Sequence, residues 1–182
     1  MRSRHWLFPA VTTLISMLAT TAIADASPTS ERSAGWQPQP GQTYQFSSRW
    51  SGRCLDVAGT GEFSNIRQWD CLRSSEQRWT FESAGGGYYY VHPVFDAGKC
   101  LDVDTRAQSG DYGGNVHLYH CWQGQNQMWR LDDIGDGWFS VIAHHNYKAL
   151  DVDTRNGNIN NANVHNWTYW GGNNQMWRIS PA

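Results

Sequence analysis

The stretch NVHLYHCWQGQNQMW, residues 115–129, recurs twice elsewhere in the chain with substitutions. The copy NVHNWTYWGGNNQMW at 163–177 agrees with it at nine of fifteen positions, and the copy NIRQWDCLRSSEQRW at 65–79 agrees with it at four. Every copy ends in Gln-x-Trp. The chain therefore contains one structural unit used three times, and the copy at 65–79 has diverged most.

A Leu-Asp-Val motif sets the length of the repeat. It follows Cys54, Cys100 and Ala149, which lie 46 and 49 residues apart, and the Gln-x-Trp glutamines lie 50 and 48 residues apart. Units of this length that each carry one part of a core cannot stand alone, so they must pack against one another. The repeats fall at about residues 43–87, 88–137 and 138–182.

Short apolar stretches, separated by Gly, Asn, Asp and Ser, fill each repeat. No window sustains a helical pattern of apolar residues at i, i+3, i+4 and i+7. The sequence instead predicts four short strands per repeat, at 44–50, 54–57, 66–70, 79–82, 88–92, 100–103, 116–120, 128–131, 139–144, 149–152, 164–168 and 176–179. Short strands with turn residues between them indicate an all-β fold that is barrel-like and closed on itself.

Residues 1–24 are interpreted as a signal peptide. A basic start precedes a mainly apolar run, and Ala22-Ile23-Ala24 has the small-x-small pattern of a signal-peptidase site. An uncleaved membrane anchor is the alternative, but Pro9 and several Ser and Thr residues make the run weak for a spanning helix. We therefore expect a secreted, extracellular protein without membrane insertion.

The residues that follow the predicted signal peptide are numerous enough for one domain, and they carry a mild net negative charge. Residues 25–42, rich in Ser, Pro, Gly and Gln, are expected to form a flexible N-terminal tail, and docking of Trp36 on the domain is the alternative. Removing Arg2 and Arg4 with the leader leaves 14 − 2 = 12 basic residues against 16 acidic ones, a net charge near −4. No basic stripe is present, which argues against a nucleic-acid or anionic-membrane partner.

The cysteines are expected to form two disulfides, since an even number in an exported chain is typical of oxidised pairs. Pairing within each repeat gives Cys54–Cys71 and Cys100–Cys121. The third repeat has Ala149 and Tyr169 at the matching positions, so both members of its pair are absent together, as pairing within repeats predicts. A zinc site is the rival interpretation, but no Cys-x-x-Cys or His-x-x-x-His grouping supports it.

Each repeat carries side chains suited to a neutral sugar. A sugar ring offers hydroxyls and one comparatively apolar C–H face, so binding it needs an aromatic plate and a carboxylate or amide. The second repeat supplies such a set in Asp102, His117, Tyr119 and Asn126. His117 and Tyr119 are two apart on a predicted strand and therefore point to the same side.

Three copies of 45–50 residues, each with Leu-Asp-Val and a closing Gln-x-Trp, and two of them with matching Cys pairs, resemble the ricin-type β-trefoil lectins. The same fold forms the family-thirteen carbohydrate-binding module of secreted glycoside hydrolases. The resemblance covers about residues 43–182. It implies a β-trefoil domain with three repeats of four short strands and pseudo-threefold symmetry.

The resemblance also implies which residues bind sugar. In ricin-type sites the Asp of Leu-Asp-Val accepts hydrogen bonds from adjacent hydroxyls, and the aromatic residue two before the second Cys stacks on the ring. Carried over, the second repeat supplies Asp102, His117, Tyr119 and Asn126, and the third supplies Asp151, His165, Trp167 and Asn174. The first repeat departs from the pattern, because it has Arg67 and Glu76 beside Asp56 and Trp69. We expect that Arg67 and Glu76 satisfy each other and occupy this pocket, so that it does not bind or binds a different sugar.

Other recurring residues are assigned structural roles. Trp79, Trp129 and Trp177 are predicted to lie in the core, and the three Gln-x-Trp glutamines to be buried hydrogen-bonding struts. Asp104-Thr105-Arg106 and Asp153-Thr154-Arg155 are interpreted as loop braces rather than as a calcium loop. Trp122 and Trp170 fit either an additional sugar platform or packing at the rim.

We therefore predict a secreted lectin that recognises galactose- or xylose-containing glycans through sites in the second and third repeats, without a cofactor or metal. The alternative is a protein-binding trefoil, such as a toxin targeting subunit or an inhibitor. We do not expect an enzyme. The motifs of serine hydrolases, zinc proteases and phosphate-binding loops are missing from the sequence, and its recurring carboxylates lie one per repeat.

Overall fold

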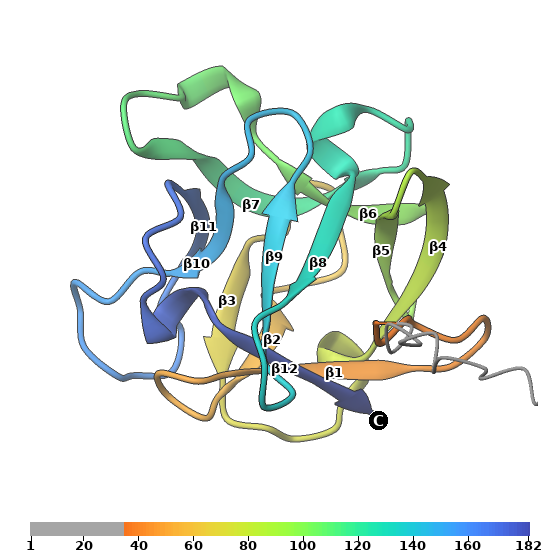
Figure 1. Cartoon of the computed structure of the whole chain (residues 1–182), viewed down its shortest axis with the longest axis horizontal. Coiled ribbons are helices and arrows are strands. Elements are labelled where there is room, and N and C mark those ends of the chain that lie inside the picture. The colour runs from red at the N-terminus through yellow and green to blue at the C-terminus, as the bar shows by residue number, and fades with distance from the viewer. Residues whose placement is uncertain (1–34) are drawn as a thin grey trace, which may run out of the picture. The chain divides into compact units, whose positions relative to one another are not determined.

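The computed structural model describes residues 35–182, and this part of the chain forms twelve strands (Figure 1). The strands are β1 (Tyr44–Ser48), β2 (Cys54–Val57), β3 (Ile66–Trp69), β4 (Trp79–Gly85), β5 (Tyr88–Pro93), β6 (Lys99–Val103), β7 (Tyr112–His120), β8 (Trp129–Asp133), β9 (Phe139–Ala143), β10 (Ala149–Val152), β11 (Val164–Trp167) and β12 (Trp177–Pro181). The 3₁₀ turns are η1 (Ser75–Gln77), η2 (Thr105–Ala107), η3 (Gln125–Gln127) and η4 (Asn173–Gln175).

Six of the strands form a closed barrel. Antiparallel pairing runs from β1 to β4, β5, β8, β9 and β12, and β12 returns to β1. Each repeat contributes its first and last strand to this ring. A closed ring leaves no unpaired strand edge, which is why three short repeats form one stable unit.

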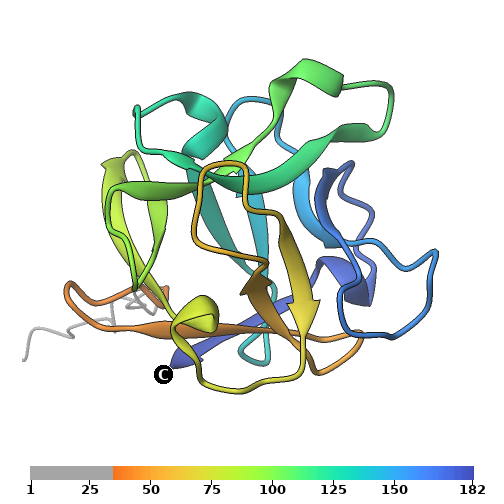
Figure 2. The same cartoon turned by 180° about the vertical axis from the view of Figure 1, so that it is seen from behind.

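The other six strands form three hairpins, one per repeat: β2–β3, β6–β7 and β10–β11. The first of them lies in front in the reverse view (Figure 2). The hairpins also contact one another, because β11 pairs with β7 and isolated bridges join Asn65 to His117 and Arg67 to Asn163. The fold is the β-trefoil that the repeats predict.

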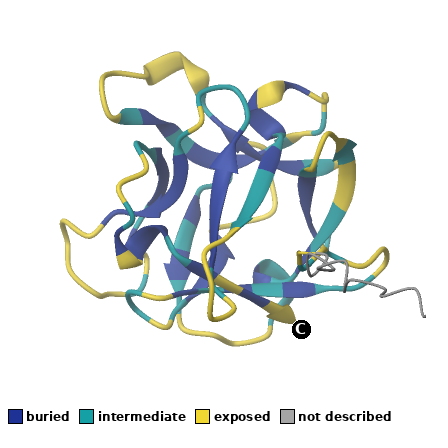
Figure 3. Cartoon of the chain, in the orientation of Figure 1, coloured by how far each residue is buried: buried dark blue, intermediate teal, exposed yellow. Residues whose placement is uncertain are grey.

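The core lies inside the barrel and beneath the hairpins, so buried residues follow the strands and exposed ones gather in the loops (Figure 3). Trp79, Trp129 and Trp177 are fully buried, which confirms their predicted role in the core. Each indole Nε1 donates a hydrogen bond to the carbonyl of the Leu in Leu-Asp-Val of its own repeat, at 3.4, 2.9 and 2.9 Å respectively. The two sequence motifs of each repeat are therefore joined directly.

The first residue of each repeated stretch contributes to a ring of amides between the hairpins. Asn65 Nδ2 donates to Asn163 Oδ1 at 2.8 Å, Asn163 Nδ2 to Asn115 Oδ1 at 2.9 Å, and Asn115 Nδ2 to Asn65 Oδ1 at 2.8 Å. Each amide is both donor and acceptor, so the ring closes with all three hydrogen bonds in one rotational sense. The three repeats meet at this point.

The observed elements agree with the predicted strands, and both disulfides, Cys54–Cys71 and Cys100–Cys121, are present. Two features differ from the expectation. The strand β7 begins at Tyr112, four residues before the predicted start, and short 3₁₀ turns precede each Gln-x-Trp tryptophan. The extension of β7 pairs Tyr112 and Gly114 with β11, a contact between repeats that a single repeat's pattern does not reveal.

Trp36 also differs from the expectation of a flexible tail. Its ring centroid lies 5.5 Å from that of Tyr44 and 5.0 Å from that of Phe139, so it packs against the barrel. The backbone N–H of Gln39 donates to the Tyr44 hydroxyl at 2.7 Å. The predicted signal peptide and the tail before residue 35 lie outside the described residues. Within residues 35–182, no helix is long and apolar enough to cross a membrane.

The asparagine ring predicts non-additive losses of stability. Asn115→Ala should lower the free energy of unfolding by about 1–3 kcal/mol, because it leaves one donor and one acceptor without partners. Adding Asn163→Ala should cost less than the single Asn163→Ala change does, since the ring is already open. Chemical denaturation of both single variants and the double variant measures this coupling. Additive losses would show that the ring does not act as a unit.

Candidate functional site

In each repeat the Asp of the Leu-Asp-Val strand is a deeply buried carboxylate. Asp56, Asp102 and Asp151 are 4, 3 and 3% exposed. A buried charge is tolerated only where hydrogen-bond donors surround it. In the first two repeats the Gln-x-Trp glutamine provides one donor: Gln77 Nε2 lies 3.0 Å from Asp56 Oδ2, and Gln127 Nε2 lies 2.8 Å from Asp102 Oδ2. The element that builds the core therefore also positions the carboxylate.

In the second repeat the donors divide between the two oxygens of Asp102. Oδ2 accepts from Gln127 and from Asn126 Nδ2, the latter at 3.1 Å, while Oδ1 lies 3.2 Å from His117 Nε2. Asn126 Nδ2 also donates to the Val103 carbonyl at 2.9 Å. Since both hydrogens of this amide are used, its Oδ1 remains to accept a hydrogen bond from a ligand.

A hollow of about 230 Å³ opens beside Asp102. Its lining brings together all four residues predicted from the second repeat, namely Asp102, His117, Tyr119 and Asn126. The half-buried ring of Tyr119 provides an aromatic wall. The register Asp102↔His117 and Cys100↔Tyr119 across β6 and β7 explains this placement, because it brings the carboxylate and the imidazole opposite each other on one hairpin.

The third repeat repeats the arrangement with one difference. Asp151 Oδ1 accepts from both Asn174 Nδ2, at 2.9 Å, and His165 Nε2, at 3.1 Å. Within residues 35–182, no side chain donates to Asp151 Oδ2, so this oxygen is available to a ligand hydroxyl. Asp151, His165 and Trp167 line a hollow of about 150 Å³. Asn174 supports the carboxylate from behind and is not part of the lining.

Trp122 and Trp170 line these two hollows, at positions compatible with both roles that the sequence left open. They are 55 and 65% exposed. A Cβ at Gly124 or Gly172 would lie 2.2 Å from the neighbouring indole, so each indole folds closely over a position where only glycine fits.

The predicted loop braces are present. Asp104 accepts from the backbone and side chain of Arg106, and Asp153 accepts from the backbone and side chain of Arg155. The side-chain hydrogen bond from Arg106 lowers the pKa of Asp104 to about 2, and Arg155 likewise lowers the pKa of Asp153. Both braces line their hollows, so they shape the site as well as the loop.

The first repeat has no open carboxylate. Arg67 Nε lies 2.6 Å from Asp56 Oδ1, and the guanidinium carbon lies 4.2 Å from the centre of the Trp69 ring. Arg67 therefore covers both the carboxylate and the aromatic face. Glu76 does not pair with Arg67 as expected. Its carboxylate lies at the start of η1. Hydrogen bonding from its own backbone N–H, and to a lesser extent from Ser74, lowers the pKa of Glu76.

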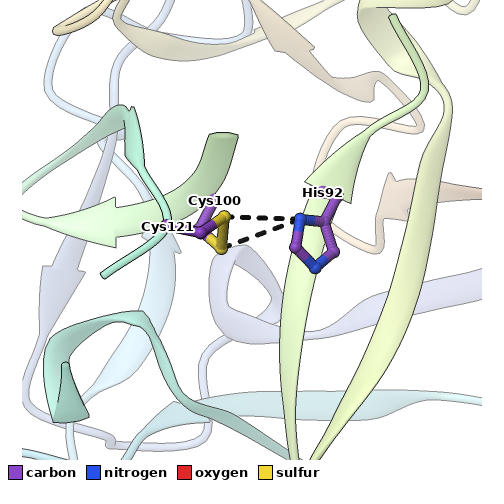
Figure 4. A group of neighbouring side chains, drawn as sticks. All are labelled: His92, Cys100 and Cys121. Carbon is purple, nitrogen blue, oxygen red and sulfur yellow. Dashed lines mark hydrogen bonds between the residues drawn. A yellow bond between two sulfur atoms is a disulfide. The ribbon is translucent and has the colours of Figure 1, made fainter. Parts of the chain in front are cut away.

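One further group has the composition of a metal site, formed by His92, Cys100 and Cys121 (Figure 4). The two sulfurs are joined in a disulfide, and His92 Nδ1 lies 3.7 and 3.4 Å from them and 3.0 Å from the Lys99 carbonyl. Zinc is bound by thiolates, which a disulfide cannot supply. The imidazole is therefore a packing and hydrogen-bonding partner of the disulfide.

Comparison with solved structures identifies several with this fold. ThreeFoil, a designed threefold-symmetric protein, is 38% identical with a TM-score of 0.71, over 77% of this chain and 99% of ThreeFoil. An exo-beta-1,3-galactanase from Clostridium thermocellum is 29% identical with a TM-score of 0.72, over 80% of this chain but only 31% of the enzyme. A ricin B-like lectin from Macrolepiota procera, solved with lactose, is 20% identical with a TM-score of 0.63, over 81% of this chain and 100% of the lectin.

Comparison with curated protein sequences finds no match. The family model of ricin-type beta-trefoil lectin domain-like proteins matches residues 32–119, 75–167 and 125–182. The three matches overlap and together extend over all three repeats, in agreement with the observed trefoil. The chain belongs to the ricin-type beta-trefoil lectin domain-like family.

Proposed function

We propose that the protein is an exported lectin that binds neutral glycans through the hollows of its second and third repeats. The observation that carries this proposal is the arrangement of Asp102 and Asp151. Each is a buried carboxylate held by a neighbouring Asn, and each opens onto a hollow that an aromatic side chain borders. The family supports carbohydrate binding in general.

The chemistry of the two hollows suits a pyranose ring. The apolar C–H face of the sugar packs on Tyr119 or Trp167, and adjacent hydroxyls donate to the carboxylate. These hydrogen bonds are charge-assisted, and they are made by groups that the protein already holds in place, so little side-chain entropy is lost on binding. A sugar with vicinal hydroxyls next to an apolar face is the ligand class that this arrangement selects.

Galactose-containing glycans are the first ligands to test, and xylose-containing glycans the second. The 29% identity to part of a galactanase favours the first choice. Shallow sites that cover one sugar ring bind weakly, on the order of −4 to −5 kcal/mol, which corresponds to dissociation constants near the millimolar range. Two such sites on one rigid domain raise the effective affinity for a polymer or a glycan-coated surface.

Export and the absence of catalysis complete the proposal. Two disulfides within one small domain are typical of oxidising compartments, which supports secretion. The Leu-Asp-Val carboxylates lie one per repeat, each on its own hairpin. The second carboxylate of each hollow, Asp104 or Asp153, is paired with an arginine. We therefore propose a binding role rather than an enzymatic one.

Replacing both carboxylates should abolish glycan binding. The combination Asp102→Ala with Asp151→Ala should lower retention on immobilised lactose or xylan at least about tenfold, because each change removes charge-assisted hydrogen bonds worth roughly 1.5–3 kcal/mol. Each single variant should keep one site, and it should lose mainly the gain in effective affinity that two sites on one domain provide. Affinity chromatography on the two resins, together with a glycan array, measures the effect.

Two controls separate binding from folding. Asp133→Ala removes an exposed carboxylate outside both hollows and should leave retention unchanged. Tyr119→Ala combined with Trp167→Ala removes the aromatic walls but keeps both buried carboxylates, and it should also abolish binding. Full retention by the double aspartate variant would refute the site assignment. Failure of the wild type to bind any glycan would favour the protein-binding alternative.

The first repeat should not respond to the sugar that the other two bind. Arg67 occupies both the carboxylate and the aromatic face there, so the indole N–H resonance of Trp69 should stay in place during an NMR titration with lactose or xylobiose. The Trp167 resonance should move. Trp138, whose ring lies 4.5 Å from the Arg178 guanidinium carbon, is the matched control, an arginine-covered indole outside both hollows. A saturable shift of Trp69 would show that the first repeat binds.

A further inference from the structure

An exposed phenylalanine of the first repeat borders the hollow of the second. Phe63 lies in the loop between β2 and β3, is 52% exposed, and has φ = 60°. A bulky residue in this left-handed region is a conformational outlier, so the surrounding contacts must hold it there. The backbone N–H of Phe63 donates to the Leu118 carbonyl at 2.7 Å, which fixes the loop to β7.

Phe63 is placed against the site residues themselves. Its ring centroid lies 5.0 Å from that of Tyr119, at an interplanar angle of 45°, and 5.3 Å from that of His117. The Arg106 guanidinium carbon lies 5.4 Å from the same ring. Phe63 is also part of the lining of the 230 Å³ hollow. The first repeat therefore contributes directly to the site of the second.

The distance between the rings decides what Phe63 can do. A centroid separation of 5.0 Å is a contact distance for two aromatic rings, so no sugar fits between Phe63 and Tyr119. Phe63 therefore does not clamp the sugar that lies on Tyr119. It extends the aromatic surface sideways, beyond the footprint of the ring that hydrogen-bonds to Asp102.

In the other two hairpins as well, a side chain from one repeat contacts site residues of another repeat. Tyr112 of the second repeat lies 6.2 Å from Trp167 and 5.7 Å from His165, ring centroid to ring centroid. Asn161 of the third repeat, at φ = 68°, accepts a hydrogen bond from Arg67 at 3.1 Å in the first. Each repeat thus contacts the neighbouring hairpin through one such side chain, but of the two aromatic ones only Phe63 lines a hollow, because Tyr112 is not part of the lining beside Asp151.

We propose that Phe63 forms a second sugar subsite of the second repeat, so that this site recognises a disaccharide unit of a neutral glycan rather than a single terminal sugar. This inference rests on the proposed function. The first sugar lies on Tyr119 and binds Asp102, and the sugar linked to it packs its C–H face on Phe63. The first repeat, whose own carboxylate is occupied, serves the neighbouring site through this loop.

The experiment isolates the second repeat with Asp151→Ala and compares a disaccharide with its monosaccharide, lactose with galactose and xylobiose with xylose. The disaccharide should bind about fivefold more tightly, an advantage in the range of one aromatic contact. Phe63→Asn should reduce this ratio to near one while changing the monosaccharide affinity less than about twofold. Asn tolerates positive φ, so the melting temperature should not fall.

Three controls accompany the measurement. Phe63→Tyr should keep the disaccharide preference. Tyr147→Asn replaces another exposed aromatic residue, 64% exposed with φ = 58°, that lines neither hollow, and it should leave the ratio unchanged. In the chain with Asp102→Ala, which keeps only the third-repeat site, Phe63→Asn should have no effect.

One result would overturn the inference alone: an unchanged ratio of disaccharide to monosaccharide affinity in Phe63→Asn, whether or not both affinities fall. Failure of the wild type to bind any of the four sugars would instead overturn the proposed function and this inference with it. The two failures are distinguishable, because the first leaves glycan binding by the Asp151→Ala chain intact.

Discussion

The domain depends on the hydrogen bonds that join Gln-x-Trp to Leu-Asp-Val. The tryptophan makes its bond in all three repeats, and the glutamine makes its bond in the first two. In the second repeat, Trp129 Nε1 holds the Leu101 carbonyl and Gln127 Nε2 holds the Asp102 carboxylate, at 2.9 and 2.8 Å. One bond belongs to the core and the next to the site, with one residue between the two donors. Because of this adjacency, the residues that hold the core of the second repeat also fix the position of its carboxylate. Buried polar groups that are fully satisfied in this way specify a single arrangement.

The repeat pattern made the fold predictable, and it made most of the second and third sites predictable as well. Period, strand positions, disulfides and buried tryptophans all follow from comparing each repeat with the others, because a residue that recurs in register has the same neighbours each time.

The features that could not be predicted are contacts between one repeat and another, or between the tail and the barrel. Phe63 is separated from Tyr119 by more than the length of one repeat, and its positive φ has no sequence signature in a phenylalanine. Trp36 falls in a segment whose composition resembles a linker, and only its contacts with Tyr44 and Phe139 reveal that it packs. The pairing of Arg67 with Asp56 rather than with Glu76 depends on the β2–β3 register, which composition does not give.

The three repeats differ in which features of the common pattern they keep. The core tryptophans and their hydrogen bonds are kept in all three, the disulfide in two, and the open carboxylate in two, but not the same two. The third repeat lacks a disulfide, yet it keeps Asp151 held by His165 and Asn174. The first keeps its disulfide while Arg67 closes its carboxylate. Covalent bracing and ligand access are therefore independent properties of a hairpin, and each can be lost without the other.

The pairing of β1 with β12 has a consequence for how the chain reaches this structure. Five residue pairs, from Tyr44↔Pro181 to Ser48↔Trp177, join the beginning of the domain to its end. The barrel cannot close until residues 177–181 have been synthesised, and until then β1 lacks the strand with which it forms most of its residue pairs. Such non-local pairing forms slowly, because the chain loses conformational entropy in closing the long loop before the new contacts stabilise it. Pairing of β12 with β1 is thus expected to be a late step in the folding of this domain, after the hairpins of the individual repeats have formed.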